Sequence, residues 1–147
     1  MPARIPTIDL GPLRGTDGER RALADELTAV YHDIGFAVLV NHGLPAGYLD
    51  NVFAMMAEFF ALSDEQKLFI DKRESRHFRG WEAVGTEFTN NRPDVREQID
   101  VWSERPALAA DVVPAYLRLL GPNQWMPDDV IAGQQALTLD WFNRLGT

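Results

Sequence analysis

The sequence contains no cysteine and few basic residues. Without cysteine it has no disulfide, no thiolate metal site and no cysteine nucleophile. Acidic residues outnumber basic ones by 22 to 14, giving a net charge of -8, and this excess argues against nucleic acid or an anionic membrane as a partner. No stretch approaches the roughly 18 consecutive apolar residues of a membrane span, and "MPARIPTIDLG" lacks the apolar core of a signal peptide. We therefore expect a cytoplasmic protein with no membrane or nucleic-acid partner.

Histidine is also scarce, which limits the metal sites that the chain can form. The three histidines are His32, His42 and His77, and their spacing matches none of the compact His-x-x-x-His metal motifs. A site of two histidines and one carboxylate would need a His-x-Asp or His-x-Glu triplet. The residues that stand two positions after the histidines are Ile34, Leu44 and Arg79. The sequence also has no Gly-x-Ser-x-Gly elbow and no glycine-rich phosphate loop. It therefore predicts neither a metal ligand set nor a catalytic residue.

The apolar residues that are present predict a single α+β domain. With 147 residues and 46% hydrophobic residues, the chain is long enough for one core. Alternating or β-branched patterns predict strands at 4–10, 36–40 and 97–102, of which "FAVLV" (36–40) is expected to be buried. Helical spacing predicts the remaining elements. These are a helix from Asp17 that ends at Gly35, a helix over 45–62, a short helix with a capping box at 63–66, and a final helix capped by Asp128 or Asp129.

The apolar face of the second helix and the positions of two loops also follow from the pattern. The stripe of this helix is predicted to consist of Leu49, Phe53, Met56 and Phe60. The segments "NNRPD" and "GPNQWMPDD" are predicted to be a turn and a loop.

Several of these motifs together resemble a known family. "IPTIDL", "GFAVLVNHGLP", "FFALSDEQK", "RGW" and "GPNQWMP" occur in this order over nearly the whole chain. They are similar to the N-terminal region of the isopenicillin N synthase-like, iron(II)- and 2-oxoglutarate-dependent dioxygenases, the non-haem dioxygenase N-terminal domain. The combination of "GF", "NHG", "FF" and a following lysine is specific to this family, whereas "IPTIDL" alone would be weak evidence for it.

The resemblance implies a fold that is completed by a second region. Residues 1–147 would form the N-terminal domain, with a helix and strand layer over about 1–70 and barrel-associated strands, a loop and a helix over 71–147. These pack on a double-stranded β-helix, or jelly roll, and the chain is expected to be truncated before the main barrel. The family's iron ligands and its Arg-x-Ser for the keto acid lie in that following half. Arg73 and Ser75 also spell Arg-x-Ser, but they lie elsewhere, and we interpret this match as chance.

The resemblance also bears on individual residues. His42 matches a turn histidine of the family, and the neighbouring Asn41 and Gly43 suit turn conformations, so a packing or turn role is expected. Residues around "FRGW" enter the substrate pocket in some family members. On this basis Arg79 would pair with a substrate carboxylate and Trp81 would supply an apolar wall, while the alternative is a first barrel strand with a surface arginine. Independently of the resemblance, the basic and aromatic segment "ESRHFRGW" makes His77 a further functional candidate, or a solvated loop histidine.

Three functions remain open from the sequence. The first is the N-terminal portion of an oxygenase that hydroxylates or desaturates a small molecule. The complete enzyme would hold iron(II) and 2-oxoglutarate, and this chain alone would bind no cofactor and be inactive. The second is a non-enzymatic interaction module that pairs with a C-terminal jelly-roll half on the same or a separate chain. The third is the remnant of a truncated gene. The strand at 97–102 would leave an unpaired edge in the isolated chain, which predicts self-association.

Overall fold

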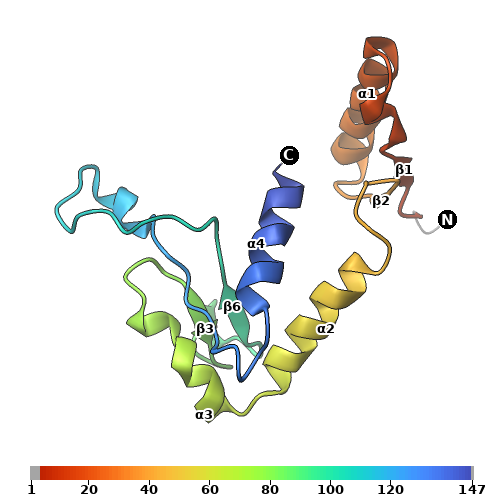
Figure 1. Ribbon diagram of the computed structural model, residues 1–147. Coiled ribbons are helices and arrows are strands. Elements are labelled where there is room, and N and C mark those ends of the chain that lie inside the picture. Colours follow the sequence, from red (N-terminus) through yellow and green to blue (C-terminus); the bar gives the residue numbers. More distant parts are fainter. Residues whose placement is uncertain (1–3, 147) are drawn as a thin grey trace. The chain divides into compact units, whose positions relative to one another are not determined.

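The computed structural model of the protein describes residues 4–146, which form short strands and helices in an α+β arrangement (Figure 1). The α+β class predicted from the sequence is therefore confirmed, and the described residues contain no closed barrel. By its internal contacts the chain divides into two compact units, Met1–Tyr48 and Leu49–Thr147. The layer boundary predicted near residue 70 concerns packing on a barrel and stays a prediction.

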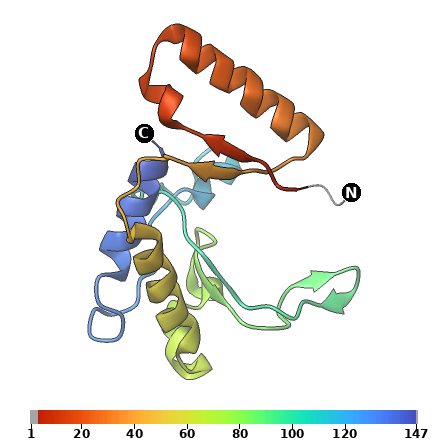
Figure 2. The same ribbon diagram turned by 90° about the vertical axis from the view of Figure 1, so that its right-hand side faces the viewer.

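The first unit is a strand, helix, strand arrangement. Strand β1 (Thr7–Asp9) pairs in parallel with β2 (Val38–Val40), and Ile8 lies opposite Leu39. The 3-10 helix η1 (Gly11–Arg14) and the long helix α1 (Asp17–Asp33) connect the two strands, and α1 lies beside them (Figure 2). A connection through a helix is expected, because parallel neighbours cannot be joined by a tight turn.

Helix α1 begins and ends close to where the sequence predicts. The Thr16 side chain accepts a hydrogen bond from the Glu19 backbone N–H, and the Glu19 carboxylate accepts one from the Thr16 backbone N–H at 2.7 Å. This capping box satisfies two backbone donors that the first turn leaves without partners. The helix ends at Asp33, before Gly35.

The predicted burial of the strand at 36–40 is wrong. All three residues of β2 are exposed, and Val38 retains 49% of its accessible surface. In this two-stranded sheet the buried side chain is Ile8 of β1, at 1% exposure. The β-branched residues therefore predicted the strand itself correctly. Strand propensity does not determine whether another layer of the protein covers the strand.

The second unit contains the remaining elements, apart from Tyr48, the first residue of α2, which belongs to the first unit. Its helices and 3-10 helices are α2 (Tyr48–Ala61), α3 (Asp64–Lys67), η2 (Leu68–Ile70), η3 (Lys72–Glu74), η4 (Ala115–Leu119) and α4 (Gln134–Leu145). Its strands are β3 (Gly80–Glu82), β4 (Phe88–Thr89), β5 (Arg92–Pro93) and β6 (Gln98–Asp100). Strands β3 and β6 pair antiparallel with Trp81 opposite Ile99, and β4 pairs with β5 in a hairpin.

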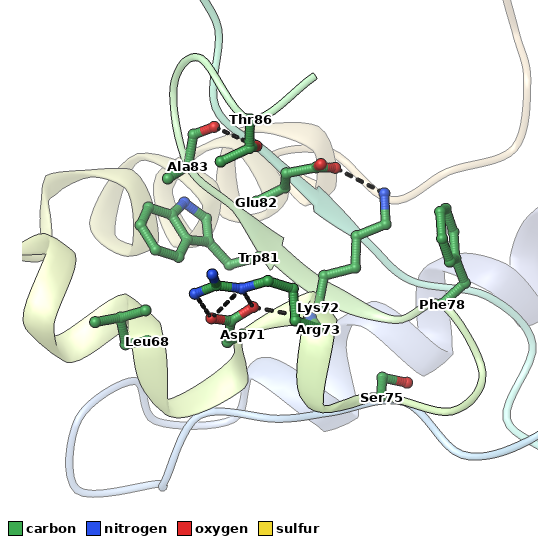
Figure 3. Close-up of a pocket in the computed structure, with 10 residues that line it drawn as sticks. All are labelled: Leu68, Asp71, Lys72, Arg73, Ser75, Phe78, Trp81, Glu82, Ala83 and Thr86. Carbon is green, nitrogen blue, oxygen red and sulfur yellow. Dashed lines mark hydrogen bonds and ion pairs between the residues drawn. The ribbon is translucent and has the colours of Figure 1, made fainter. Parts of the chain in front are cut away.

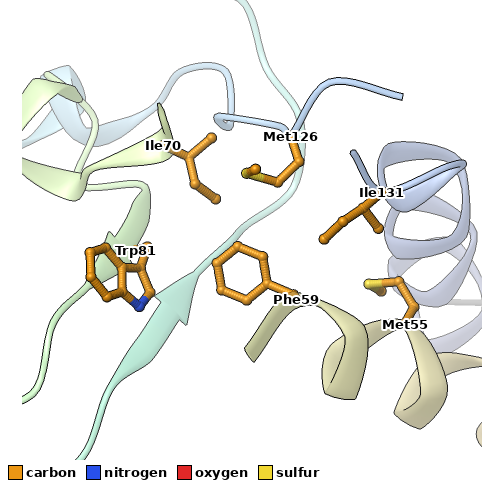
Figure 4. Packing of buried hydrophobic residues seen from close by; sticks show 6 residues of the cluster. All are labelled: Met55, Phe59, Ile70, Trp81, Met126 and Ile131. Carbon is orange, nitrogen blue, oxygen red and sulfur yellow. The ribbon is translucent and has the colours of Figure 1, made fainter. Parts of the chain in front are cut away.

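The core of the second unit gathers around Phe59 of α2. Figure 4 shows the Phe59 ring among apolar side chains from other segments of the unit. The buried cluster consists of Met55, Phe59, Ile70, Trp81, Met126 and Ile131. The predicted stripe of α2 is therefore partly wrong, because Phe53 is 69% exposed. Apolar residues occupy two adjacent sides of this helix, so the spacing alone did not decide which side is buried.

Other predicted boundaries can be compared with the structure directly. The capping box at 63–66 is confirmed: the Ser63 side chain accepts from the Gln66 N–H, and the Gln66 side chain accepts from the Ser63 N–H at 3.1 Å. The turn in "NNRPD" is confirmed by positive φ angles of 51° and 61° at Asn90 and Asn91. These angles suit a tight hairpin between β4 and β5. The strand at 97–102 is also confirmed, as β6.

The predicted start of the last helix is wrong. Helix α4 begins at Gln134 and is preceded by Gly133, so neither Asp128 nor Asp129 caps it. Asp128 instead accepts a hydrogen bond from the Gly133 N–H at 3.2 Å, which closes a turn before the helix. Aspartate is favoured in such turns for the same reason as at helix starts, since its carboxylate accepts from nearby backbone N–H groups. Among the helices of residues 4–146, none has the length and apolar character needed to cross a membrane.

Candidate functional site

A cavity of about 320 Å³ lies in the second unit between the η2–η3 segment and strand β3 (Figure 3). Its walls combine apolar side chains with several charged ones. The lining residues are Leu68, Asp71, Lys72, Arg73, Ser75, Phe78, Trp81, Glu82, Ala83 and Thr86.

Trp81 forms one wall of this cavity and is also part of the core, at 3% exposure. Its indole Nε1 donates a hydrogen bond of 2.8 Å to Glu97. The same carboxylate oxygen accepts from the ammonium of Lys67 at 2.7 Å, and that ammonium lies 5.1 Å from the Trp81 ring centroid. Hydrogen bonding and a cation–π contact therefore fix the orientation of the ring.

Lys72 carries the second buried charge of the site. Its ammonium lies 2.7 Å from Glu82 and 2.6 Å from Asp100, 4.0 Å above the Phe78 ring and 3.9 Å from Glu87. Burial lowers the pKa of Lys72, but the hydrogen bonds to Asp100 and Glu82 outweigh this effect, so the net pKa is raised. An ammonium held in this way donates hydrogen bonds at neutral pH and does not act as a base or nucleophile.

The carboxylates of the cavity are held in their charged form. The hydrogen bond from Lys72 is the main cause that lowers the pKa of Glu82. Likewise, hydrogen bonds from the Arg73 side chain lower the pKa of Asp71, and the Arg73 Nε lies 3.0 Å from the Asp71 carboxylate. These are charge-assisted hydrogen bonds, which are stronger than neutral ones. The site therefore presents fixed charges of both signs beside an aromatic wall.

The Arg-x-Ser sequence at Arg73 and Ser75 serves the local structure. Arg73 pairs with Asp71, and the Ser75 hydroxyl accepts from the backbone N–H groups of His77 at 3.2 Å and Arg79 at 3.1 Å. Both side chains therefore have partners within the same segment.

Arg79 and Trp81, the two residues predicted to contact substrate, do not line this cavity together. Trp81 does, whereas the Arg79 guanidinium binds backbone carbonyls: His77 at 2.5 Å, Phe78 at 3.2 Å and Leu119 at 3.1 Å. Its Nε is buried, and within residues 4–146 it has no hydrogen-bond partner. In this structure Arg79 connects two chain segments, and its predicted contact with substrate stays a prediction.

The histidines lie in three separate segments, and each histidine ring contacts a different polar group. His32 lies on α1 beside a carboxylate, and His77 Nδ1 lies 2.9 Å from the backbone carbonyl of Arg118. His42 accepts the backbone N–H two residues further on at 3.1 Å, within a turn where Asn41 has a φ of 53°. The described part of the chain contains no group of three His, Asp or Glu side chains that could hold a metal ion.

Lys67 and Lys72 organise the site, but the sequence indicated Lys67 only as a motif lysine and gave Lys72 no role. They are the only lysines in the chain, and they stand at the two ends of the segment "KLFIDK", which contains the short apolar run "LFI". Both are buried, with 3% and 7% of their surface exposed. Lysines in an apolar run are a signal for buried ion pairs, because a buried ammonium needs a carboxylate partner.

The family model for the N-terminal region of non-haem dioxygenases, described as "non-haem dioxygenase in morphine synthesis N-terminal", matches residues 5–128. The chain belongs to this family. Membership confirms the resemblance read from the sequence motifs.

Characterised relatives and solved structures agree with this membership. The chain is 33% identical to the 2-oxoglutarate-dependent dioxygenase frbJ of Dothideomycetidae sp., over 97% of this chain and 37% of that protein. It is 29% identical to a homoarginine-6-hydroxylase of Arabidopsis thaliana, over 82% of this chain and 36% of the relative. The structure of full-length Neurospora crassa T7H in complex with α-KG matches 96% of this chain and 42% of that chain, with 24% identity and a TM-score of 0.72. This chain therefore spans between a third and a half of the length of these proteins.

Proposed function

We propose that this chain is the N-terminal portion of an iron(II)- and 2-oxoglutarate-dependent oxygenase that hydroxylates or desaturates a small molecule. The observation that carries the proposal is the family match over residues 5–128. The dioxygenases that align with this chain extend well beyond it, since 37% of the frbJ protein is matched. In the proposed enzyme, this chain packs on the jelly roll of the C-terminal half and shapes its mouth.

The proposal assigns iron(II) and 2-oxoglutarate to the complete enzyme and no cofactor to this chain. Iron(II) in such oxygenases takes two histidines and one carboxylate on one face. The described residues offer no such set, and each histidine already lies beside another group of the protein, Asp33 for His32, the Leu44 N–H for His42 and the Arg118 carbonyl for His77. On this basis the chain alone is inactive.

The proposed substrate is a small molecule, in line with the relatives. A homoarginine-6-hydroxylase is among them, and another T7H structure holds α-KG and thymine. For this chain we propose that Trp81 supplies an apolar wall, which its place in the cavity lining supports. The Arg79 guanidinium already donates to the backbone carbonyls of His77, Phe78 and Leu119. A substrate carboxylate at Arg79 would therefore compete with these carbonyls for the guanidinium.

A calorimetric titration of the purified chain with iron(II) and 2-oxoglutarate, under anaerobic conditions, tests the assignment of the cofactors. We expect no stoichiometric heat that depends on iron(II), because three facial ligands cannot be assembled. Full-length T7H is the positive control. One-to-one binding that requires iron(II) would contradict the proposal.

An interaction module is the second candidate, and the exposure of β2 favours it. Phe36, Val38 and Val40 lie at alternating positions, and each remains exposed. An exposed apolar strand is a site for association. In this reading the C-terminal jelly-roll half, on the same or a separate chain, covers these residues, and the isolated chain self-associates instead.

A further inference from the structure

A second cavity, of about 410 Å³, lies on the second unit where residues 76–77 meet η4. It is lined by Arg76, His77, Leu108, Ala115, Arg118 and Leu119. We propose that this cavity binds the carboxylate of an organic acid with an apolar body. The proposal rests on this unit alone and does not depend on the proposed oxygenase function.

Two hydrogen bonds between distant segments build the cavity. His77 Nδ1 lies 2.9 Å from the carbonyl of Arg118, 41 residues away, and Arg79 donates to the carbonyl of Leu119 at 3.1 Å. A carbonyl only accepts, so Nδ1 carries the proton in this contact. The His77 ring also lies so close to Gly121 that a Cβ at that glycine would come within 2.3 Å of it. The floor of the cavity is therefore fixed by contacts rather than by a free loop.

The two arginines of the cavity are not neutralised by the protein. Within residues 4–146, neither Arg76 nor Arg118 forms an ion pair, whereas Arg73, Arg96 and Arg144 each pair with a carboxylate. The Arg118 side chain makes one hydrogen bond, from Nε to the carbonyl of Ala115 at 3.3 Å. No acidic residue lines the cavity. In a chain with 22 acidic residues, two unmatched guanidinium groups in one cavity mark a place for an anion from outside.

The rest of the lining selects the kind of anion. A guanidinium group offers parallel N–H donors that match a carboxylate in a bidentate arrangement. Leu108, Ala115 and Leu119 supply apolar walls next to the arginines. Apolar walls with a few placed polar groups are typical of small-molecule sites. An organic acid with an aliphatic or aromatic body satisfies both parts of the lining, and a bare phosphate satisfies only one.

Amide chemical shifts of the isotope-labelled chain, followed during titration with 4-phenylbutanoate, test this site directly. We expect saturable shifts at residues 76–77 and 118–119. The variants R76Q and R118Q should each weaken binding by about tenfold or more, because each removes charge-assisted hydrogen bonds. R92Q is the matched control, since it removes the same charge from an exposed arginine of β5 and should leave the affinity unchanged. 4-Phenylbutanamide, which keeps the body and lacks the charge, should not bind.

Three results would overturn the proposal. If R92Q weakened binding of 4-phenylbutanoate as much as R76Q and R118Q do, the acid would be attracted by the overall charge. If 4-phenylbutanamide bound as tightly as 4-phenylbutanoate, the contact would be purely apolar. If inorganic phosphate bound as tightly as 4-phenylbutanoate, the apolar walls would have no role. Arg76 is exposed and has no ion pair within the described residues, so R76Q should keep the fold even if R118Q does not. Unchanged backbone N–H chemical shifts outside the cavity verify that R76Q keeps the fold.

Discussion

Lys67 and Glu97, 30 residues apart in sequence, form an ion pair of 2.7 Å beside the ring of Trp81. Glu97 also accepts the indole N–H of Trp81 at 2.8 Å. A single carboxylate thus connects the end of α3 with strand β3. The wall of the cavity and a buried ion pair are parts of one arrangement, so changes to one should affect the other.

Replacing Glu97 with glutamine should lower the free energy of unfolding by about 2 kcal/mol, because it leaves the buried Lys67 ammonium without its main partner. Glutamine still offers an oxygen to the Trp81 indole, so the substitution isolates the ion pair. The midpoint of urea unfolding measures the effect. Glu58→Gln on α2, an exposed position, should change stability by less than about 0.5 kcal/mol. Equal effects of the two variants would show that the ion pair contributes nothing.

The ion pair of Glu82 with Lys72 should make the stability of the fold depend on pH. Its pKa in the folded protein lies below the ordinary value of 4.5 for a glutamate, chiefly because Lys72 donates a hydrogen bond to it. A carboxyl with a lowered folded pKa contributes stability above its unfolded pKa, and that contribution is lost as the pH falls through the folded pKa. We therefore expect stability to decline as the pH falls below about 4.5, and Lys72→Met to flatten this dependence and to reduce stability at pH 7.

Urea unfolding of both proteins from pH 7 to pH 3 measures this dependence. Arg92→Met, which removes an exposed cation from β5, is the control and should leave the pH dependence unchanged. A Lys72→Met variant with the same pH dependence as the parent chain would contradict the account of Glu82.

Gly80 should tolerate no side chain. It has a φ of 118°, and a Cβ there would lie 2.2 Å from the carbonyl oxygen of Ile70. Gly80→Ala therefore adds a backbone clash to conformational strain and should cost about 3 kcal/mol or more. Gly85 has a comparable φ of 81°, but the nearest atom to its Cβ position is 3.8 Å away, so Gly85→Ala should cost only about 1 kcal/mol. Thermal or urea unfolding measures the loss of stability in each variant. Equal losses for Gly80→Ala and Gly85→Ala would contradict the predicted clash at Gly80.

The exposed side chains of β2 predict association of the isolated chain. Val38→Lys should reduce self-association without a loss of stability, because Val38 is already 49% exposed. Val95→Lys is the matched control, since Val95 is 93% exposed on the second unit. Light scattering coupled to size-exclusion chromatography over a range of protein concentrations measures the oligomeric state. A monomer at high concentration would contradict this prediction.

Local features of the fold could be predicted from the sequence, because their signals are local. The capping box at Ser63 and the turn at Asn90 and Asn91 depend on residues that are neighbours in sequence. The two-residue strands around that turn were not predicted, since so short a run has no recognisable periodicity. The exposure of β2 could not be predicted either, because it depends on whether a further layer is present.

The candidate sites depend on contacts that no local pattern contains. Lys72 meets Asp100, and His77 meets the backbone of Arg118, across 28 and 41 residues. The sequence shows which charges exist but not which of them pair. For this reason the lysines that organise the cavity were missed, and the carbonyl partners of Arg79 were not foreseen. The substrate contacts of Arg79 and Trp81 stay predictions.

The central claim is that this chain is one portion of a longer oxygenase. The most direct test is the intact mass of the native polypeptide in its source cell, detected with an antibody against this region. Because the chain spans 37% of the frbJ relative, we expect a species of more than twice the 16.6 kDa of this chain. A single species of 16.6 kDa would contradict the claim and favour the interaction module or the remnant of a truncated gene.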